Sequence, residues 1–265
     1  MKNFYITILS IIALSTPSCE TQVDLNLKSV EPKLVIDASI GVRNPCRVIL
    51  SKTRDYDDQT PPEYVKGAKV TLTDSNGHSE VLVDVGDIHL SRAMGHIGET
   101  YTLTVELDGE TYTATDMIPT FVPIDELLLY RIKVGNEAHY YPQIAYQDPK
   151  GEDNYYYHLL TINDKTMLQA NWEDDKNRDG LIIKSTLYFD KDENQDNDLK
   201  VGDHIRVEMQ TLGKGAYTFY KTISSPGGAA NSNPKSNFSG NVLGMFKTYN
   251  TTYIEATLTE EDFDF

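Results

Sequence analysis

The acidic segment 175–180, with the sequence Asp-Lys-Asn-Arg-Asp-Gly, is the clearest local pattern of residues that could bind a metal ion. Asp175, Asn177 and Asp179 place side-chain oxygens at alternate positions, and Gly180 stands where a calcium-binding loop makes its sharp turn. Ca²⁺ is coordinated by oxygen ligands at this spacing. The segment therefore predicts a calcium site with these three residues as metal ligands.

The calcium pattern covers only half of a complete loop. Counted from Asp175, the twelfth position is Thr186, where a bidentate glutamate would close the coordination sphere. A second acidic stretch at 190–198 could supply the missing ligands if the intervening strand folds back. The alternative is a pair of solvated hairpin turns, because Asp, Asn and Gly are common in turns without a metal.

Motifs of the common enzyme classes are absent from the sequence. There is no GxSxG nucleophile elbow, phosphate loop or dinucleotide fingerprint. Paired carboxylates of the glycosidase kind cannot be identified among 40 acidic residues without their distances. The histidines show neither an HExxH motif nor a paired zinc-site spacing, and they are His78, His89, His96, His139, His158 and His204. We therefore predict that the protein is not an enzyme.

Cys19 stands at the end of a segment that resembles a secretory signal. Lys2 is followed by an apolar run over 4–14, which is too short to remain as a membrane-spanning helix, and then by small or turn-forming residues at 15–18. This order predicts a lipoprotein signal peptide over 1–18, with Cys19 as the lipid-bearing first residue of the mature chain. An ordinary secretory signal that contains a cysteine is the alternative. Acyl chains contribute about 0.8 kcal/mol per buried methylene, so two or more of them anchor a protein stably.

Composition limits the partners of the mature chain. Removal of Lys2 with the signal changes the formal net charge from −16 to −17, which disfavours binding to nucleic acid or to an anionic membrane surface. Cations and basic partners remain compatible with this charge. Once Cys19 is lipidated, only Cys46 is left, so no intrachain disulfide can form, and we expect Cys46 to be a buried small hydrophobic residue.

Strict alternation of apolar and polar residues from Lys33 onward predicts an N-terminal β-sandwich over 33–119, of the immunoglobulin or prealbumin type. Residues 19–32 form the lipidated tether that precedes it. Two predicted hairpin turns support the sandwich, one at 75–77 (Ser-Asn-Gly) and one at Asp108-Gly109, where the residues tolerate positive φ.

Pro119 and Pro123 end this region, and a second β-rich domain is predicted over 120–259. Its one plausible helix covers Gly215–Ser224, although the Tyr and Thr content there would also suit a strand. We expect 241–250 and 251–258 to form a closing hairpin, with an acidic tail over 260–265. The fold class is therefore mainly β, with at most one short helix.

Tyrosines are clustered in the strands of the second region. Tyr140-Tyr141, Tyr155-Tyr156-Tyr157 and Tyr188 could stack on sugars or anchor a partner protein if they are exposed. The alternative is that tyrosine favours half-buried strands, and we favour this interpretation for most of them.

Five segments together resemble the DUF4249 family, a domain of unknown function in outer-membrane lipoproteins of Bacteroidota. In the order of the family they are EPKLVIDASI, VKGAKVTLTDSNG, GETYTLTVELDGETYTATDMIPTFVPID, LKVGDHIRVEMQTL and NPKSNFSGNVLGMF. They cover most of the mature chain, which is shorter than many members in its second half. The resemblance implies residence in the cell envelope and association with a TonB-dependent outer-membrane receptor. It carries over no catalytic or ligand residues.

Three classes of function remain open. The leading hypothesis is a non-enzymatic lipoprotein, held at the outer membrane by Cys19, that assists a TonB-dependent receptor in nutrient binding or uptake. The second is a structural or adhesive surface module, and the third is a glycan-active enzyme with paired carboxylates. The side of the membrane, periplasmic or external, is left open by the sequence.

Overall fold

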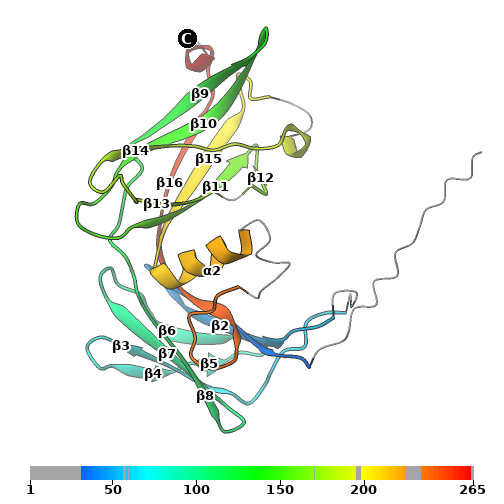
Figure 1. The fold of residues 1–265 in the computed structure, drawn as a ribbon, viewed down its shortest axis with the longest axis vertical. Helices are drawn as coiled ribbons and strands as arrows, with labels where there is room; N and C mark the ends of the chain where they lie inside the picture. Colours follow the sequence, from blue (N-terminus) through cyan, green and yellow to red (C-terminus); the bar gives the residue numbers. More distant parts are fainter. Residues whose placement is uncertain are drawn as a thin grey trace, which may run out of the picture. The chain divides into compact units, whose positions relative to one another are not determined.

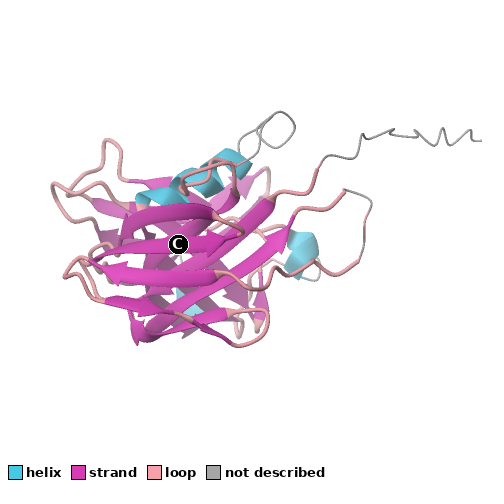
Figure 2. Ribbon diagram, turned by 90° about the horizontal axis from the view of Figure 1, so that it is seen from below, coloured by secondary structure: helices cyan, strands magenta, loops and turns pink. Residues whose placement is uncertain are grey.

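The architecture follows from the alternation of buried and exposed side chains along the chain. The computed structural model describes residues 31–55, 58, 60–169, 171–194, 198–224 and 234–263. The predicted signal peptide, Cys19 and most of the predicted tether lie outside these ranges. The predicted fold class is confirmed, since strands make up most of the described chain and accompany one α-helix (Figure 2).

The N-terminal region contains eight strands, most of which are labelled in Figure 1. They are β1 (Leu34–Gly41), β2 (Asn44–Lys52), β3 (Lys69–Asp74), β4 (Ser79–Val81), β5 (Val83–Asp84), β6 (His89–Met94), β7 (Thr100–Leu107) and β8 (Glu110–Met117). The predicted turn at Asp108-Gly109 joins β7 to β8 with φ angles of 52° and 83°, as its sequence requires. Strand β6 had no counterpart among the sequence predictions.

The remaining elements follow after the two prolines. They are β9 (Glu126–Val134), β10 (Glu137–Gln147), β11 (Tyr155–Ile162), β12 (Lys165–Thr166), β13 (Asn171–Asp174), β14 (Ile182–Thr186), β15 (His204–Leu212), α2 (Lys214–Ser224) and β16 (Leu243–Thr257), with 3₁₀ turns η1 (Lys191–Asn194) and η2 (Glu260–Phe263). The predicted helix at 215–224 is confirmed. No helix in the described ranges is long and apolar enough to cross a bilayer.

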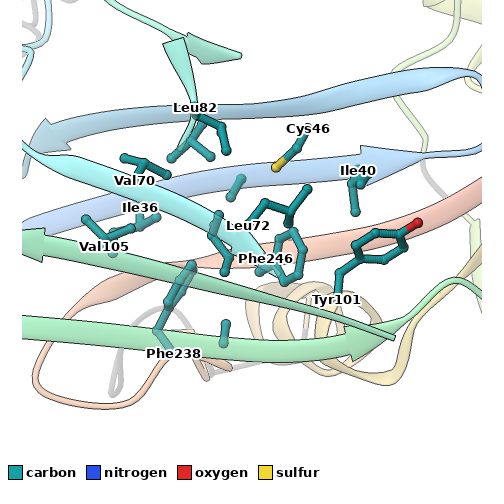
Figure 3. Packing of buried hydrophobic residues seen from close by; sticks show 14 of the residues in the cluster. Ile36, Ile40, Cys46, Val70, Leu72, Leu82, Tyr101, Val105, Phe238 and Phe246 are labelled. Carbon is teal, nitrogen blue, oxygen red and sulfur yellow. The ribbon is translucent and has the colours of Figure 1, made fainter. Parts of the chain in front are cut away.

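One nine-stranded sheet takes part in two hydrophobic cores. Its strands run in the order β12-β11-β15-β16-β1-β2-β6-β5, and β13 pairs with β11 at the side. Side chains of β1 and β2 pack against the sheet β4-β3-β7-β8 in the first core, which Figure 3 shows. Side chains of β11 and β15 pack with those of the sheet β14-β10-β9 in the second core.

Strand β16 is continuous, so the prediction of a closing hairpin is wrong. Its first half pairs in parallel with β1, from Leu243 to Tyr249, and its second half pairs antiparallel with β15, from Tyr249 to Thr257. The segment around Asn250 contains no glycine or proline, and the Asn250 amide donates to the carbonyl oxygens of residues 119 and 120 at 2.7 and 3.1 Å instead of making a turn.

The two halves of β16 serve different cores. Phe246, which is fully buried, belongs to the first core together with Phe238, whereas Ile254 packs against the second. Gly244 allows the parallel pairing, because its φ is +97° and a Cβ there would lie 2.0 Å from the carbonyl oxygen of Ile36. Residues 238–246, beyond the predicted boundary at 119, therefore complete the first core.

Helix α2 is held at its first turn by a carboxylate that lies 99 residues earlier in the chain. The Gly215 N–H donates to Asp116 Oδ2 of β8 at 3.1 Å, and the Met117 N–H donates to Asp116 Oδ1 at 3.0 Å. A carboxylate at this end satisfies an unpaired N–H and matches the helix dipole. Burial nevertheless raises the pKa of Asp116 to about 6, because it outweighs these hydrogen bonds.

Candidate functional site

Three aspartates from two separate loops meet at one end of the second core. Asp148 follows β10, Asp175 follows β13, and Asp179 precedes β14. Each offers an oxygen atom that lies within 4.8 Å of the other two. Asp148 and Asp175 are buried, with 1% and 8% of their surface exposed, and Asp179 is exposed.

The sheet pairings explain why these loops meet. Strand β10 pairs with β14, so that Gln147 faces Ile182, and β11 pairs with β13, so that Tyr155 faces Asp174. The loop 148–154 leaves β10 and enters β11, while the loop 175–181 leaves β13 and enters β14. Both loops are therefore brought to the same end of neighbouring strands (Figure 1).

Hydrogen-bond donors hold each carboxylate in place. The hydroxyl of Tyr156 donates to Asp148 Oδ1 at 2.5 Å, and the Gly180 N–H donates to Asp148 Oδ2 at 3.0 Å. The backbone N–H of Asn154 donates to Asp175 Oδ2 at 3.1 Å. The Gly151 N–H donates to Asp179 Oδ1 at 2.6 Å.

The cluster carries uncompensated negative charge. Within the part of the chain that the structure describes, no lysine, arginine or histidine nitrogen lies within 4.0 Å of these three carboxylates. Burial raises the pKa of Asp175, and the charges of Asp148 and Asp153 raise it further, although the Asn154 N–H acts in the opposite direction. An arrangement of this kind can accept a proton or a cation.

The sequence located two of these three residues. Asp175 and Asp179 are brought together as the half-loop pattern predicted, and Gly180 adopts φ +69°. Asn177 is exposed at a left-handed turn with φ 65°, and its role as a ligand stays a prediction. Asp148 was missed, because it stands 27 residues before Asp175; its only signal is an aspartate at a strand end followed by Pro-Lys-Gly.

The second acidic stretch does not join the cluster through any of its described residues. Asp198 instead pairs with Lys191 at 2.7 Å and with His139 at 3.2 Å. Glu193 accepts a hydrogen bond from the backbone N–H of Leu168 at 2.7 Å. The hypothesis that this stretch supplies the missing ligands is therefore wrong for its described residues, because their carboxylates interact with other groups. Residues 195–197 lie outside the described ranges.

Glu173 organises a second polar group near the same end. It pairs with Arg178 at 2.9 Å, accepts a hydrogen bond from the Ser185 hydroxyl, and lies 3.5 Å from Nδ1 of His158. His158 is fully buried, and burial lowers its pKa to about 4. The imidazole is therefore neutral at neutral pH, and the Glu173 charge is compensated mainly by Arg178.

Packing accounts for most of the clustered tyrosines. Tyr157 stacks on Trp172 with ring centroids 3.9 Å apart, and Trp172 stacks on Tyr220 of α2 at 4.2 Å. Tyr156 is buried, and Tyr155 stacks on Tyr217 at 4.6 Å. In addition, Tyr140 contacts Phe263, and Tyr141 contacts Tyr188 and Phe189, in edge-to-face geometry. These contacts favour the half-buried strand interpretation.

Two open pockets lie away from the carboxylate cluster. One, of about 530 Å³, is lined by His78 and His96, and each of these pairs with its own carboxylate, Asp74 or Glu99, at 3.0 and 3.2 Å. The other, of about 420 Å³, is lined by Val42, Arg43, Ile97, Phe121 and residues 250–253. Its apolar rim is exposed, which is typical of surfaces that bind a partner.

The structure describes Cys46 but not Cys19. Cys46 is fully buried in the first core, and burial raises the pKa of its thiol to about 12, so the prediction of a buried hydrophobic residue is confirmed. Cys19 and the predicted signal peptide lie outside the described residues, and both the signal peptide and lipidation stay predictions.

Comparisons with known proteins identify a family without an assigned activity. The model of a domain of unknown function, DUF4249, matches residues 20–255. A solved structure, the two fibronectin type-III domain segment from chicken tenascin, is 10% identical over 86% of this chain and 99% of that chain, with a TM-score of 0.24. The curated proteins contain no match to the sequence.

Proposed function

The chain belongs to the DUF4249 family, and from this membership we propose that it is a non-enzymatic lipoprotein of the cell envelope. In this proposal Cys19 carries the lipid that holds the protein at the outer membrane. The folded part then assists a TonB-dependent receptor in the binding or uptake of a nutrient.

The position of Cys19 is the observation that carries the proposal. It directly follows the short apolar run and the small residues of the signal-like segment, and the family match begins at the next residue, Glu20. A lipid on this thiol would leave the whole family region on the aqueous side of its anchor. Such a protein acts on partners in or beside the membrane.

The pocket lined by Phe121 and Tyr253 offers a surface for the receptor. Ile97, Phe121 and Tyr253 are 50%, 44% and 56% exposed around it, and Arg43 adds a positive charge. Exposed aromatic side chains beside an arginine are typical of protein-binding surfaces. We propose that this rim contacts the receptor.

The absence of an enzymatic role is part of the proposal. Two carboxyl groups described above have raised pKa values, and they lie in different surroundings. Asp116 accepts the Gly215 N–H at the first turn of α2, whereas Asp175 belongs to the loop cluster. A glycosidase needs such a pair on either side of one substrate.

A structural or adhesive module is the second candidate. The observation that favours it is strand β16, which runs without interruption from the first core into the second. A strand shared by two cores is expected in a protein that holds two modules at a fixed spacing. The structural or adhesive hypothesis requires no receptor.

Purification of the tagged full chain from native membranes in mild detergent tests the proposal. The accessory role predicts that a TonB-dependent receptor is recovered with it, and that Phe121→Ser with Tyr253→Ser lowers this recovery several-fold. Tyr188→Ser, at a tyrosine of similar exposure (45%), is the matched control and should leave recovery unchanged. Recovery of the lipoprotein without a receptor would favour the structural module.

A further inference from the structure

We propose that Asp148, Asp175 and Asp179 bind one calcium ion, with the side-chain oxygen of Asn154 as a fourth ligand. The site lies where the loops 148–154 and 175–181 meet. It goes beyond the accessory role, which requires no metal.

The spacing of the carboxylate oxygens fits a single calcium ion. Ca²⁺–oxygen distances are about 2.3–2.6 Å, so two ligands on opposite sides of the ion lie at most about 5 Å apart. The candidate oxygens of the three aspartates lie within 4.8 Å of one another. All three can therefore reach one ion without a large change in the backbone.

The charge of the cluster also points to a cation. Asp148 is 1% exposed and Asp175 is 8% exposed, and no basic side chain among the described residues forms an ion pair with either. Two buried carboxylates this close repel each other strongly, because the low dielectric around them screens little of their charge. A divalent ion would neutralise both.

Asn154 provides an observation independent of the acidic cluster. Its side chain is 1% exposed, and its Oδ1 has no hydrogen-bond donor among the described residues. Asn154 and Asp175 are bonded twice, since the Asn154 N–H donates to Asp175 Oδ2 and the Asp175 N–H donates to the Asn154 carbonyl oxygen at 3.2 Å. A bound water or ion would satisfy such a buried amide oxygen, and the backbone of the same residue already contacts Asp175 of the cluster.

The existing hydrogen bonds leave room for coordination. A carboxylate oxygen has two lone pairs, so Asp148 can keep its bonds from Tyr156 and from the Gly180 N–H while it binds a metal. Asp175 accepts the Asn154 N–H on Oδ2, and Asp179 accepts the Gly151 N–H on Oδ1. The donors orient the ligands, as outer hydrogen bonds commonly do at metal sites.

The donor set favours calcium over other metals. It consists of carboxylate and amide oxygens in irregular loops, and it contains no histidine or cysteine of the kind that zinc prefers. Magnesium usually keeps several waters and binds through one or two carboxylates, whereas calcium accepts more protein ligands in flexible geometry.

Calorimetric titration of the EDTA-treated full chain in detergent tests the site, with Ca²⁺ and Mg²⁺ as separate titrants. We expect one Ca²⁺ per chain with a dissociation constant on the order of 10⁻⁴ M, the range of extracellular modules, and at least a tenfold weaker response to Mg²⁺. Asp179→Asn should weaken Ca²⁺ binding about tenfold or more. This residue is exposed, so its substitution should leave the fold intact.

Asp164→Asn is the matched control, because it removes the same charge from an exposed turn between β11 and β12. It should bind Ca²⁺ as the unmodified chain does. Three results would overturn the proposal: no Ca²⁺ binding at millimolar concentration, equal binding by Asp179→Asn and Asp164→Asn, or tighter binding of Mg²⁺ than of Ca²⁺.

Discussion

Replacement of Asp116 by asparagine should change how the stability of the protein depends on pH. Asp116 links β8 to the first turn of α2, and burial raises its pKa from 3.8 to about 6. Because the folded state holds the proton more tightly than the unfolded state, this carboxyl contributes stability that is fully present below pH 3.8. The contribution is lost as the pH rises through about 6.

The size of the effect follows from the pKa difference. A carboxyl pKa that is raised from 3.8 to about 6 corresponds to about 3 kcal/mol of unfolding free energy over the whole range. Between about pH 4.5 and about pH 7.5, roughly 2 kcal/mol of this should be lost. Asparagine does not titrate, so Asp116→Asn should lack this loss, while every other carboxyl group titrates in both proteins.

Urea unfolding at both pH values measures the difference. The free energy of unfolding of Asp116→Asn, relative to that of the unmodified chain, should rise by about 2 kcal/mol from the lower pH to the higher one. Asp164→Asn, in an exposed turn, should follow the unmodified chain. If Asp116→Asn also shows the same change between the two pH values as the unmodified chain, the assignment of a buried, proton-holding carboxyl is wrong.

Three further predictions concern the cores. Phe246→Ala should lower the free energy of unfolding by about 3–5 kcal/mol, because it leaves a cavity in the first core. Leu168→Ala, at a site that is 84% exposed, should change it by less than about 0.5 kcal/mol. Denaturant titration of both variants measures the difference. Tyr220→Ala should shift the fluorescence emission of Trp172, the single tryptophan, to longer wavelength, since one ring that covers it is removed; Tyr188→Ala should not. Cys46 should react with iodoacetamide only after unfolding, because its thiol is buried with a raised pKa; rapid native labelling, seen by mass spectrometry, would contradict the packing.

Local patterns predicted much of the fold. Alternation predicted many of the strands, although not β6. The Asp108-Gly109 pair predicted a hairpin, because positive φ at both positions is a property of those two residues and their turn. The continuity of β16 could not be predicted in this way. Its parallel pairing joins Val35 to Leu243, and no local pattern records a partner so far away in the chain.

The candidate calcium site could also be predicted only in part from the sequence. Asp175 and Asp179 belong to one short motif, so their spacing was visible in the sequence. Asp148 and Asn154 reach the cluster only because β10 pairs with β14 and β11 with β13. The sequence offered the acidic stretch at 190–198 as an alternative source of ligands, and only the fold distinguishes the two.

The lipid on Cys19 is the premise on which the proposed function depends most. The direct measurement is incorporation of a labelled fatty acid into the full chain in cells, compared among the unmodified chain, Cys19→Ala and Cys46→Ala. The account predicts label in the unmodified chain and in Cys46→Ala, and none in Cys19→Ala, which should also leave the membrane fraction. Equal labelling of all three proteins, or no label in the unmodified chain, would contradict it.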